Sequence, residues 1–331
     1  MNRGNFNFLN TNSFYQNADK KWIITLDECH KFWYDLIVFP NQLNDKINTR
    51  TLITQKLKEI ELNVKKHLDK RFIYFICSRT KIRFNIKKWI LFNPISKYTY
   101  IPILIGKNKV KKYIKVKFID CANKNKRPKI YLQENFISIF YYDGNKETLP
   151  VHEFLDLSKI NLGISNKVEY VGYTNEPSRR PTNGSHTGLS DILYKISNED
   201  NDFLIYFNTF KVRVITDTNN SSLNIIASNA MTNEVNIDTE GKIIEKCFIS
   251  YFNSNTQNRN RKNEDSYLYN NMENLSSKYK IHSIEIYYYQ TEESDYTLFS
   301  SSSVVAKHEH YFSVSLNNSN IDITRDIEPL L

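Results

Sequence analysis

One segment of the chain has apolar residues at helical spacing. Its apolar positions are three or four residues apart, at Ile53, Leu57, Ile60, Val64 and Leu68. Lysines and glutamates fill many of the positions between them, so the spacing predicts an amphipathic helix of roughly five turns. A shorter helix is predicted over 29–36, and Pro40 would prevent it from continuing further. Residues 1–20 are rich in asparagine and are predicted to form an arm or loop.

Most other apolar segments are short and are typical of strands. In 81–87 apolar and polar residues alternate strictly, which predicts a strand with one buried face. The segment 136–142 ends at Asp143-Gly144, a dipeptide that favours a tight turn. The other predicted strands are 71–77, 113–118, 130–132, 151–157, 168–173, 284–289 and 311–316. The mixture predicts an α+β protein with a mainly antiparallel sheet in its first half.

The charge of the chain is divided unequally between its two halves. Residues 1–150 contain 29 Lys and Arg against 12 Asp and Glu, a net charge of +17, whereas residues 151–331 carry −8. This asymmetry indicates that the first half faces a polyanion, for which nucleic acid is the obvious candidate. A solvated lysine-rich surface explains the same count without a partner. We predict a basic α+β domain over 1–148 that binds DNA, and a second domain over 149–331.

A basic stretch within the first half is the predicted DNA contact. Its chosen members are Lys109, Lys111, Lys112, Lys115, Lys117, Lys126 and Arg127. Tyr113 and Phe118 are interleaved with these cations, which is the arrangement expected of a ridge that contacts phosphates. The alternative interpretation is an ordinary exposed strand whose lysines prevent edge-to-edge pairing.

Composition narrows the class of protein further. No apolar run is long enough to cross a membrane, and the first residues lack the apolar core of a secretory signal, so we expect a cytoplasmic protein. The four cysteines are far apart in sequence and are interpreted as buried apolar residues, not as a metal cluster. The oligomeric state stays open, a homo-oligomer included.

The second half contains a candidate site for phosphate chemistry. The predicted strand 168–173 ends near Gly172, and 174–180 is predicted to open a helix with Thr174 or Asn175 as its cap. A strand, a glycine turn and an arginine-bearing helix would place a tyrosine and an arginine beside one phosphate. A second helix, with Glu245 near its start, is predicted over 241–253.

These residues resemble a known nuclease family. Tyr170-Val171-Gly172, then Thr174 and then Arg180, is similar to the second half of the signature of GIY-YIG nucleases. The helix that carries Glu245, with Asn258 thirteen residues later, is similar to the family's metal-binding helix. The resemblance covers about residues 150–260 and implies a small GIY-YIG-like sheet flanked by helices, with a C-terminal strand extension.

Two departures from the family pattern stand out. The first signature tripeptide has no match upstream of Tyr170, where the candidate strand offers only His152, Phe154 or Asp156. The long interval between Arg180 and Glu245 implies an inserted strand and loop around 203–229.

The resemblance implies a Mg²⁺- or Mn²⁺-dependent endonuclease that hydrolyses DNA, in restriction or another anti-phage role. Glu245 would hold the metal, and Arg180, or Arg179 in its place, would bind the non-bridging phosphate oxygens. Tyr170 would position or deprotonate the attacking water, and a nearby cation would have to lower its pKa for it to act as a base. His186, on a glycine-flanked loop, is a further candidate proton donor or base. Asn258 is assigned to the nucleic-acid contact.

Three other interpretations remain. A different nuclease class would use Asp217 or Asp238 with Glu240 and Lys242. His308-Glu309-His310 places two histidines on one side of a strand, but without a third ligand nearby we attribute this to chance. The chain can also be a non-catalytic protein that binds nucleic acid or another partner and retains a degenerate nuclease fold.

Overall fold

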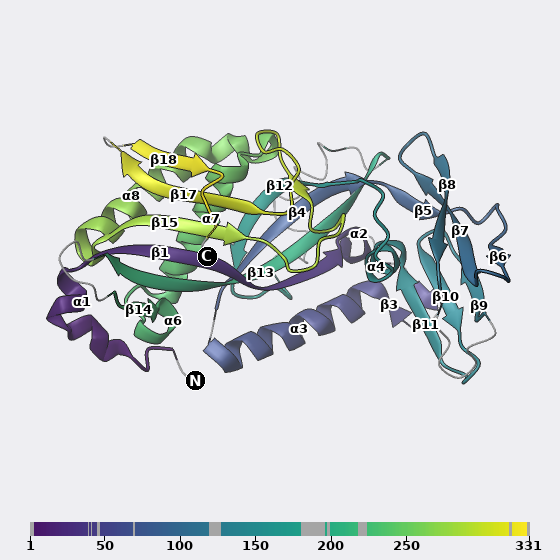
Figure 1. The fold of residues 1–331 in the computed structure, drawn as a ribbon, viewed down its shortest axis with the longest axis horizontal. Coiled ribbons are helices and arrows are strands. Elements are labelled where there is room, and N and C mark those ends of the chain that lie inside the picture. The colour runs from purple at the N-terminus through teal and green to yellow at the C-terminus, as the bar shows by residue number, and fades with distance from the viewer. Residues whose placement is uncertain are drawn as a thin grey trace.

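A computed structural model describes residues 3–38, 40, 42–44, 47–68, 70–118, 127–179, 196, 199–217, 224–317 and 320–329. These residues form the predicted α+β class, with several sheets and helices (Figure 1). Among them no helix is both long enough and apolar enough to cross a membrane.

A nine-stranded sheet is the centre of the molecule. Its strand order is β16-β12-β4-β13-β1-β15-β17-β18, and β14 pairs with β13. The bounds are β1 (Asp19–Trp33), β4 (Phe72–Thr80), β12 (Asn166–Thr174), β13 (Asn201–Asp217), β14 (Ile226–Ser228), β15 (Ile281–Tyr288), β16 (Phe299–Ser300), β17 (His310–Asn317) and β18 (Asn320–Arg325). Strands from both halves of the chain alternate in this sheet. The predicted boundary at 148/149 therefore does not separate two sheets.

Smaller sheets lie at one end of the molecule, away from α1 (Figure 1). The basic sheet, as we call it, is β5 (Ile82–Phe84), β6 (Leu91–Asn93), β7 (Tyr98–Ile105) and β8 (Val110–Val116). Beside it are β9 (Lys129–Leu132), β10 (Phe136–Phe140) and β11 (Lys146–Pro150), and the short pair β2 (Gln42–Asn44) and β3 (Ile47–Asn48). The predicted strands 81–87, 113–118, 130–132 and 136–142 lie here.

Helices cover both faces of the central sheet. In the described part of the chain the helices are α1 (Ser13–Asn17), α2 (Asp35–Val38), α3 (Thr49–Leu68), α4 (Val151–Leu157), α6 (Asn229–Thr232), α7 (Ile237–Phe252) and α8 (Arg261–Tyr279), and the 3-10 helices are η1 (Asn7–Thr11) and η2 (Asn255–Asn260). One face of β4, with Phe72, Tyr74 and Ile76, packs with apolar residues of α3. The other face, with Ile73, Phe75 and Cys77, packs with α7. This double burial explains why β4 is apolar without alternation.

The structure corrects three of the predicted elements. Residues 29–33 continue β1, paired residue by residue with β13, and do not start a helix. Residues 151–157 form helix α4, because the buried Val151, Phe154 and Leu155 have helical spacing that we had interpreted as alternation. Strand β12 extends to Thr174, so no helix opens there, and 177–179 form a turn.

Asp202, at the start of β13, joins the basic sheet to the central sheet. Its fully buried carboxylate accepts from the Ile82 amide at 3.0 Å and from both terminal nitrogens of Arg83 at 2.8 Å. His152 Nε2 on α4 donates to it at 2.9 Å, and His152 Nδ1 accepts from the Tyr296 hydroxyl. Burial alone would raise the pKa of Asp202, but His152 and Arg83 outweigh it and lower that pKa to about 2.

We expect Asp202→Asn to destabilise the protein by about 3–5 kcal/mol, because it removes the buried counter-charge of Arg83, whose side chain is only 20% exposed. Chemical denaturation monitored by far-UV circular dichroism would measure the change. Glu199→Gln is the matched control: it removes the exposed Lys107–Glu199 pair, which joins the same two parts of the chain, and should cost less than about 1 kcal/mol. Equal losses for the two variants would contradict the role of Asp202.

His310 holds the end of helix α7 against the sheet. Its Nδ1 lies 3.0 Å from the Tyr251 hydroxyl, and the Tyr251 ring stacks on Phe312 with centroids 4.0 Å apart. Burial, aided by the charge of Lys307, lowers the pKa of His310 to about 3. The folded protein therefore keeps this imidazole neutral across the physiological range.

The pKa of His310 predicts a loss of stability in mild acid. Below pH 6.5 the unfolded chain binds a proton at this residue and the folded chain does not, so stability falls as the pH is lowered. At pH 5 the loss from this group is about 2 kcal/mol. Denaturation at pH 7.5 and pH 5 should show that His310→Gln loses about 2 kcal/mol less than the wild type between the two. If the wild type and His310→Gln lost the same stability between pH 7.5 and pH 5, His310 would be protonated in the folded protein at pH 5.

Candidate functional site

A cavity of about 440 Å³ brings together residues from β4, β12, α7 and α8. Its walls are Tyr74, Tyr170, Tyr173, Lys242, Glu245, Lys246, Asn263, Glu264 and Tyr267. Two of the residues predicted from sequence, Tyr170 and Glu245, thus line one cavity although they are 75 positions apart. We call this cavity the tyrosine–glutamate pocket.

A bulge in β12 puts Tyr170 on the same face of the sheet as Tyr74. Val168 pairs with Cys77 and Tyr170 pairs with Ile76, so Glu169 is an extra residue in the strand. In a regular strand without the bulge, Tyr170 would share the face of Val168, which packs towards α7. With it, the rings of Tyr74 and Tyr170 lie side by side with centroids 5.9 Å apart.

Gly172 makes room for the two rings. It stands directly opposite Tyr74 in the strand pairing. A Cβ atom at this position would lie 2.5 Å from the Tyr74 hydroxyl and 2.7 Å from Tyr170 Cε1, closer than real Cβ contacts. The glycine is needed here for close approach and not for a turn, which differs from the glycine turn that we predicted.

Residues after α7 cover the edge of β12 beside the pocket. Gln257 in η2 donates to the Val171 carbonyl at 2.8 Å and accepts from the Val171 amide at 3.0 Å, as a neighbouring strand would. Ser254 donates to the Glu169 carbonyl at 2.9 Å. The buried Glu169 carboxylate accepts from the Ser78 hydroxyl of β4 at 2.7 Å and does not line the pocket.

The start of α7 is fixed against Tyr173. Gly241 lets the helix approach, since a Cβ there would lie 2.5 Å from the Tyr173 ring. The Tyr173 hydroxyl donates to Asp238 at 2.6 Å, and Arg71 Nε donates to the same oxygen at 2.8 Å. Burial and the bond to Asp238 raise the pKa of Tyr173 to about 12, so its hydroxyl stays protonated. Glu245 follows Gly241 by one helical turn and thereby reaches the pocket.

Lys246 links two carboxylates at the pocket. Its Nζ lies 3.0 Å from Glu245 and 2.5 Å from Glu264 of α8. Burial alone would lower the pKa of Lys246, but the two glutamates outweigh it and raise that pKa. The side chains of Lys246 and Glu245 are 14% and 13% exposed, so screening by solvent is limited. Glu245 therefore faces a cation in the structure as it stands.

The donor set of the pocket suits a metal that is held by few protein ligands. In the described part of the chain no three His, Cys, Asp or Glu side chains gather into a metal cage. Mg²⁺ commonly binds through one or two carboxylates, with water and substrate phosphate in the other positions. Glu245, with Glu264 nearby, fits that pattern.

Other predicted residues lie elsewhere or outside the described residues. Arg179 is exposed on the turn after β12 and pairs with Glu176 at 3.4 Å. Arg180 and His186 lie outside the described residues. The backbone of Asn258 belongs to η2, next to the edge of β12.

Sequence reasoning missed Tyr74. The family pattern predicts a second tyrosine on the strand next to Tyr170, and residues 152–156 were the predicted strand. These residues form α4, which is not in the sheet. The strand beside β12 is β4, almost a hundred residues earlier in the sequence. The only signal for it in the sequence is a tyrosine with a polar hydroxyl in the otherwise apolar strand Phe72-Ile73-Tyr74-Phe75-Ile76.

The predicted DNA-contacting lysines lie on the basic sheet and not beside the pocket. Lys111, Lys112 and Lys115 are exposed on β8, and Lys109 is exposed in the turn before it. Arg127 lies over the ring of Phe92, 5.3 Å from its centroid. Lys117 follows β8, and Lys126 lies outside the described residues.

The alternative acidic set is divided by the structure. Glu240 is buried and pairs with Arg3 at 2.7 Å, and it also accepts from Asn229. Asp238 pairs with Arg71, as described above. These two carboxylates have different partners and do not form a shared metal site. Of the other pair, His308 contacts Thr297 at 2.9 Å and His310 contacts Tyr251.

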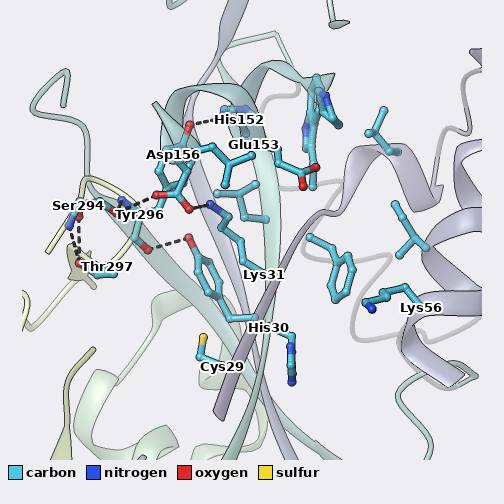
Figure 2. A pocket seen from close by; sticks show the side chains of 18 of the residues that line it. Cys29, His30, Lys31, Lys56, His152, Glu153, Asp156, Ser294, Tyr296 and Thr297 are labelled. Atoms are coloured by element: carbon cyan, nitrogen blue, oxygen red, sulfur yellow. Dashed lines mark hydrogen bonds and ion pairs between the residues drawn. The ribbon is translucent and has the colours of Figure 1, made fainter. Parts of the chain in front are cut away.

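A larger cavity of about 760 Å³ lies between β1, α3 and α4 (Figure 2). Lys31 points to Asp156 and lies 3.8 Å from the centroid of the Tyr296 ring, and Ser294 donates to Asp156 at 3.0 Å. Burial lowers the pKa of Lys31, and Asp156 opposes that shift. His152 reaches Tyr296 in the same network. These polar groups bind one another, so their evident role is to hold α4 to the central sheet.

Comparison with known proteins gives no relatives: no protein-family model, no curated protein and no solved structure matches the chain.

Proposed function

We propose that the protein is a metal-dependent endonuclease that hydrolyses DNA at the tyrosine–glutamate pocket. The observation that carries this proposal is the convergence of Tyr74, Tyr170 and Glu245 on one cavity from three separate elements. We further propose that β4, β12, β13 and α7 form a GIY-YIG-like unit. In that unit Tyr74 takes the place of the tyrosine in the missing first tripeptide.

Each group of the pocket has a role in this reaction. The hydroxyls of Tyr74 and Tyr170 orient the attacking water, and one of them, ionised to its phenolate beside a bound cation, would accept the proton of that water. Lys242, on the pocket wall, faces the phosphoryl oxygens and stabilises the charge that develops on them. Tyr173 is a positioning residue, because its proton is held by Asp238. The arginine proposed to bind the non-bridging phosphate oxygens is Arg179 or Arg180.

Glu245 is the residue proposed to hold Mg²⁺ or Mn²⁺. The bound cation supplies charge neutralisation and polarises the phosphate. For the carboxylate to accept it, the ion pair with Lys246 must loosen, and Glu264 can retain the lysine at 2.5 Å. Lys246 therefore keeps the two carboxylates in place without repulsion until the substrate arrives.

The same ion pair favours a second candidate function. The ammonium group of Lys246 lies between Glu245 and Glu264, so it balances the charge of these carboxylates without a metal ion. A protein that binds nucleic acid or another partner and no longer cleaves would keep this arrangement. Cleavage assays separate the two candidates.

We expect wild-type protein to cleave plasmid DNA with Mg²⁺ or Mn²⁺, and Glu245→Ala to lose at least about 100-fold in rate, because the metal loses its carboxylate ligand. Nicking and linearisation on agarose gels would measure both. Glu273→Ala is the matched control, since Glu273 is an exposed glutamate of α8 outside the pocket.

Cleavage by Glu245→Ala at the wild-type rate would show that the site is elsewhere. No cleavage by the wild type, on plasmids from several sources and with both metals, would favour the non-catalytic candidate.

We expect Tyr74→Phe to reduce the cleavage rate by about 10- to 100-fold while the protein stays folded, because only the hydroxyl that orients water is removed. Tyr289→Phe, at an exposed tyrosine beyond β15, is the control and should cleave normally. Rates are compared at saturating metal, and melting curves check the fold. A Tyr74→Phe protein as fast as the wild type would leave Tyr74 with a packing role only.

A further inference from the structure

The basic sheet has cations and no acids of its own. Residues 82–116 contain nine Lys and Arg and no Asp or Glu. Arg83 binds Asp202, and Lys107 pairs with Glu199, both on the central-sheet side. The other cations face outward or lie in turns, so this part of the surface has a strong positive potential.

One face of this sheet is turned away from the core and bears aromatic side chains between lysines. Strand pairing places Leu91 beside Tyr100, Tyr100 beside Lys115, and Leu104 beside Lys111. Tyr113 shares this outer face, because it alternates with the buried Ile114. The opposite face, with Ile101, Ile103 and Ile114, is in the core.

Trp89 stands at the rim of the outer face. It is 86% exposed, and the Tyr113 hydroxyl donates to its carbonyl at 3.4 Å. Leu91 and Tyr113 are 51% and 41% exposed, and Lys115 lies over the Tyr98 ring at 3.9 Å. Trp89, Leu91 and Tyr113 thus expose large apolar side chains close together, and such a group is typical of a contact surface.

The chemistry of this face favours one partner. A protein partner or a membrane would suit the apolar residues, but the cations without acids favour a polyanion. A nucleic acid strand offers both phosphates for lysines and flat bases for aromatic rings. Aromatic side chains on an open sheet bind bases that are unpaired, since paired bases hide their faces.

We propose that the outer face of the basic sheet binds a single-stranded stretch of nucleic acid, with Trp89 and Tyr113 stacking on bases and Lys111 and Lys115 contacting phosphates. This inference rests on the proposed function only in that it deepens the description of its substrate. The surface lies on a different sheet from the tyrosine–glutamate pocket, so binding can be tested without cleavage.

Trp89 gives a direct readout of base stacking. The other two tryptophans, Trp22 and Trp33, are 0% and 5% exposed, so added solutes act mainly on the emission of Trp89. The experiment uses full-length Glu245→Ala protein in EDTA at fixed salt, titrated with a 20-nucleotide oligothymidine, a duplex of the same length or inorganic polyphosphate. Fluorescence anisotropy of labelled oligonucleotide measures affinity in parallel.

We expect the single strand to quench the Trp89 emission, and polyphosphate to bind without comparable quenching because it has no bases. Trp89→Ala should weaken single-strand binding by about tenfold. The control variant Val305→Ala, at a residue that is 85% exposed outside the basic sheet, should bind normally.

Single-strand binding with unchanged emission, or equal affinity of Trp89→Ala and wild type, would overturn the proposal. Quenching by the duplex alone would also overturn it and would indicate insertion between paired bases. Binding with quenching in a protein that never cleaves DNA would uphold this inference and reject the nuclease function.

Discussion

The buried carboxylate of Asp202 is the constraint on which the arrangement of the molecule depends. It accepts hydrogen bonds from β5, from Arg83 and from α4, and through His152 it reaches Tyr296. A buried carboxylate of this kind is unfavourable unless every one of these donors is present. Three segments far apart in sequence must therefore meet at one point. An ion pair at this point joins the two halves of the chain, whose net charges have opposite signs.

Strand β4 transmits this constraint to the candidate site. Tyr74 in the tyrosine–glutamate pocket and Arg83 at the Asp202 carboxylate belong to one continuous stretch of ten residues. Both faces of β4 are buried, by α3 and by α7, so the strand has little freedom to shift. The bulge at Glu169 and the space at Gly172 then set where Tyr170 lies relative to Tyr74.

Much of this architecture was accessible from sequence, and the exceptions have physical causes. Periodicity predicted α3, and short apolar runs predicted β4 and β12, because burial of one or both faces determines those patterns. It did not predict that β4 and β12 are neighbours, because pairing between distant strands leaves no local signal. The prediction of a strand over Val151–Leu157 was wrong, because in a segment of only seven residues the apolar positions fit both the helical period and the strand period. Tyr170 and Glu245 were found by motif, whereas Tyr74 required the strand order.

The two surfaces of interest are related through the same rigid path. The basic sheet is held by Arg83 and by the Ile82 amide, and the tyrosine–glutamate pocket is held by β4, which ends two residues before β5 begins. A strand of nucleic acid bound on the basic sheet would therefore have a fixed position relative to the pocket, without any flexible linker between binding and chemistry. Charge has opposite uses at the two places. The basic sheet leaves its lysines open to a polyanion, whereas the pocket closes Lys246 between two glutamates. A negatively charged substrate that arrives with a bound cation would separate Lys246 from Glu245.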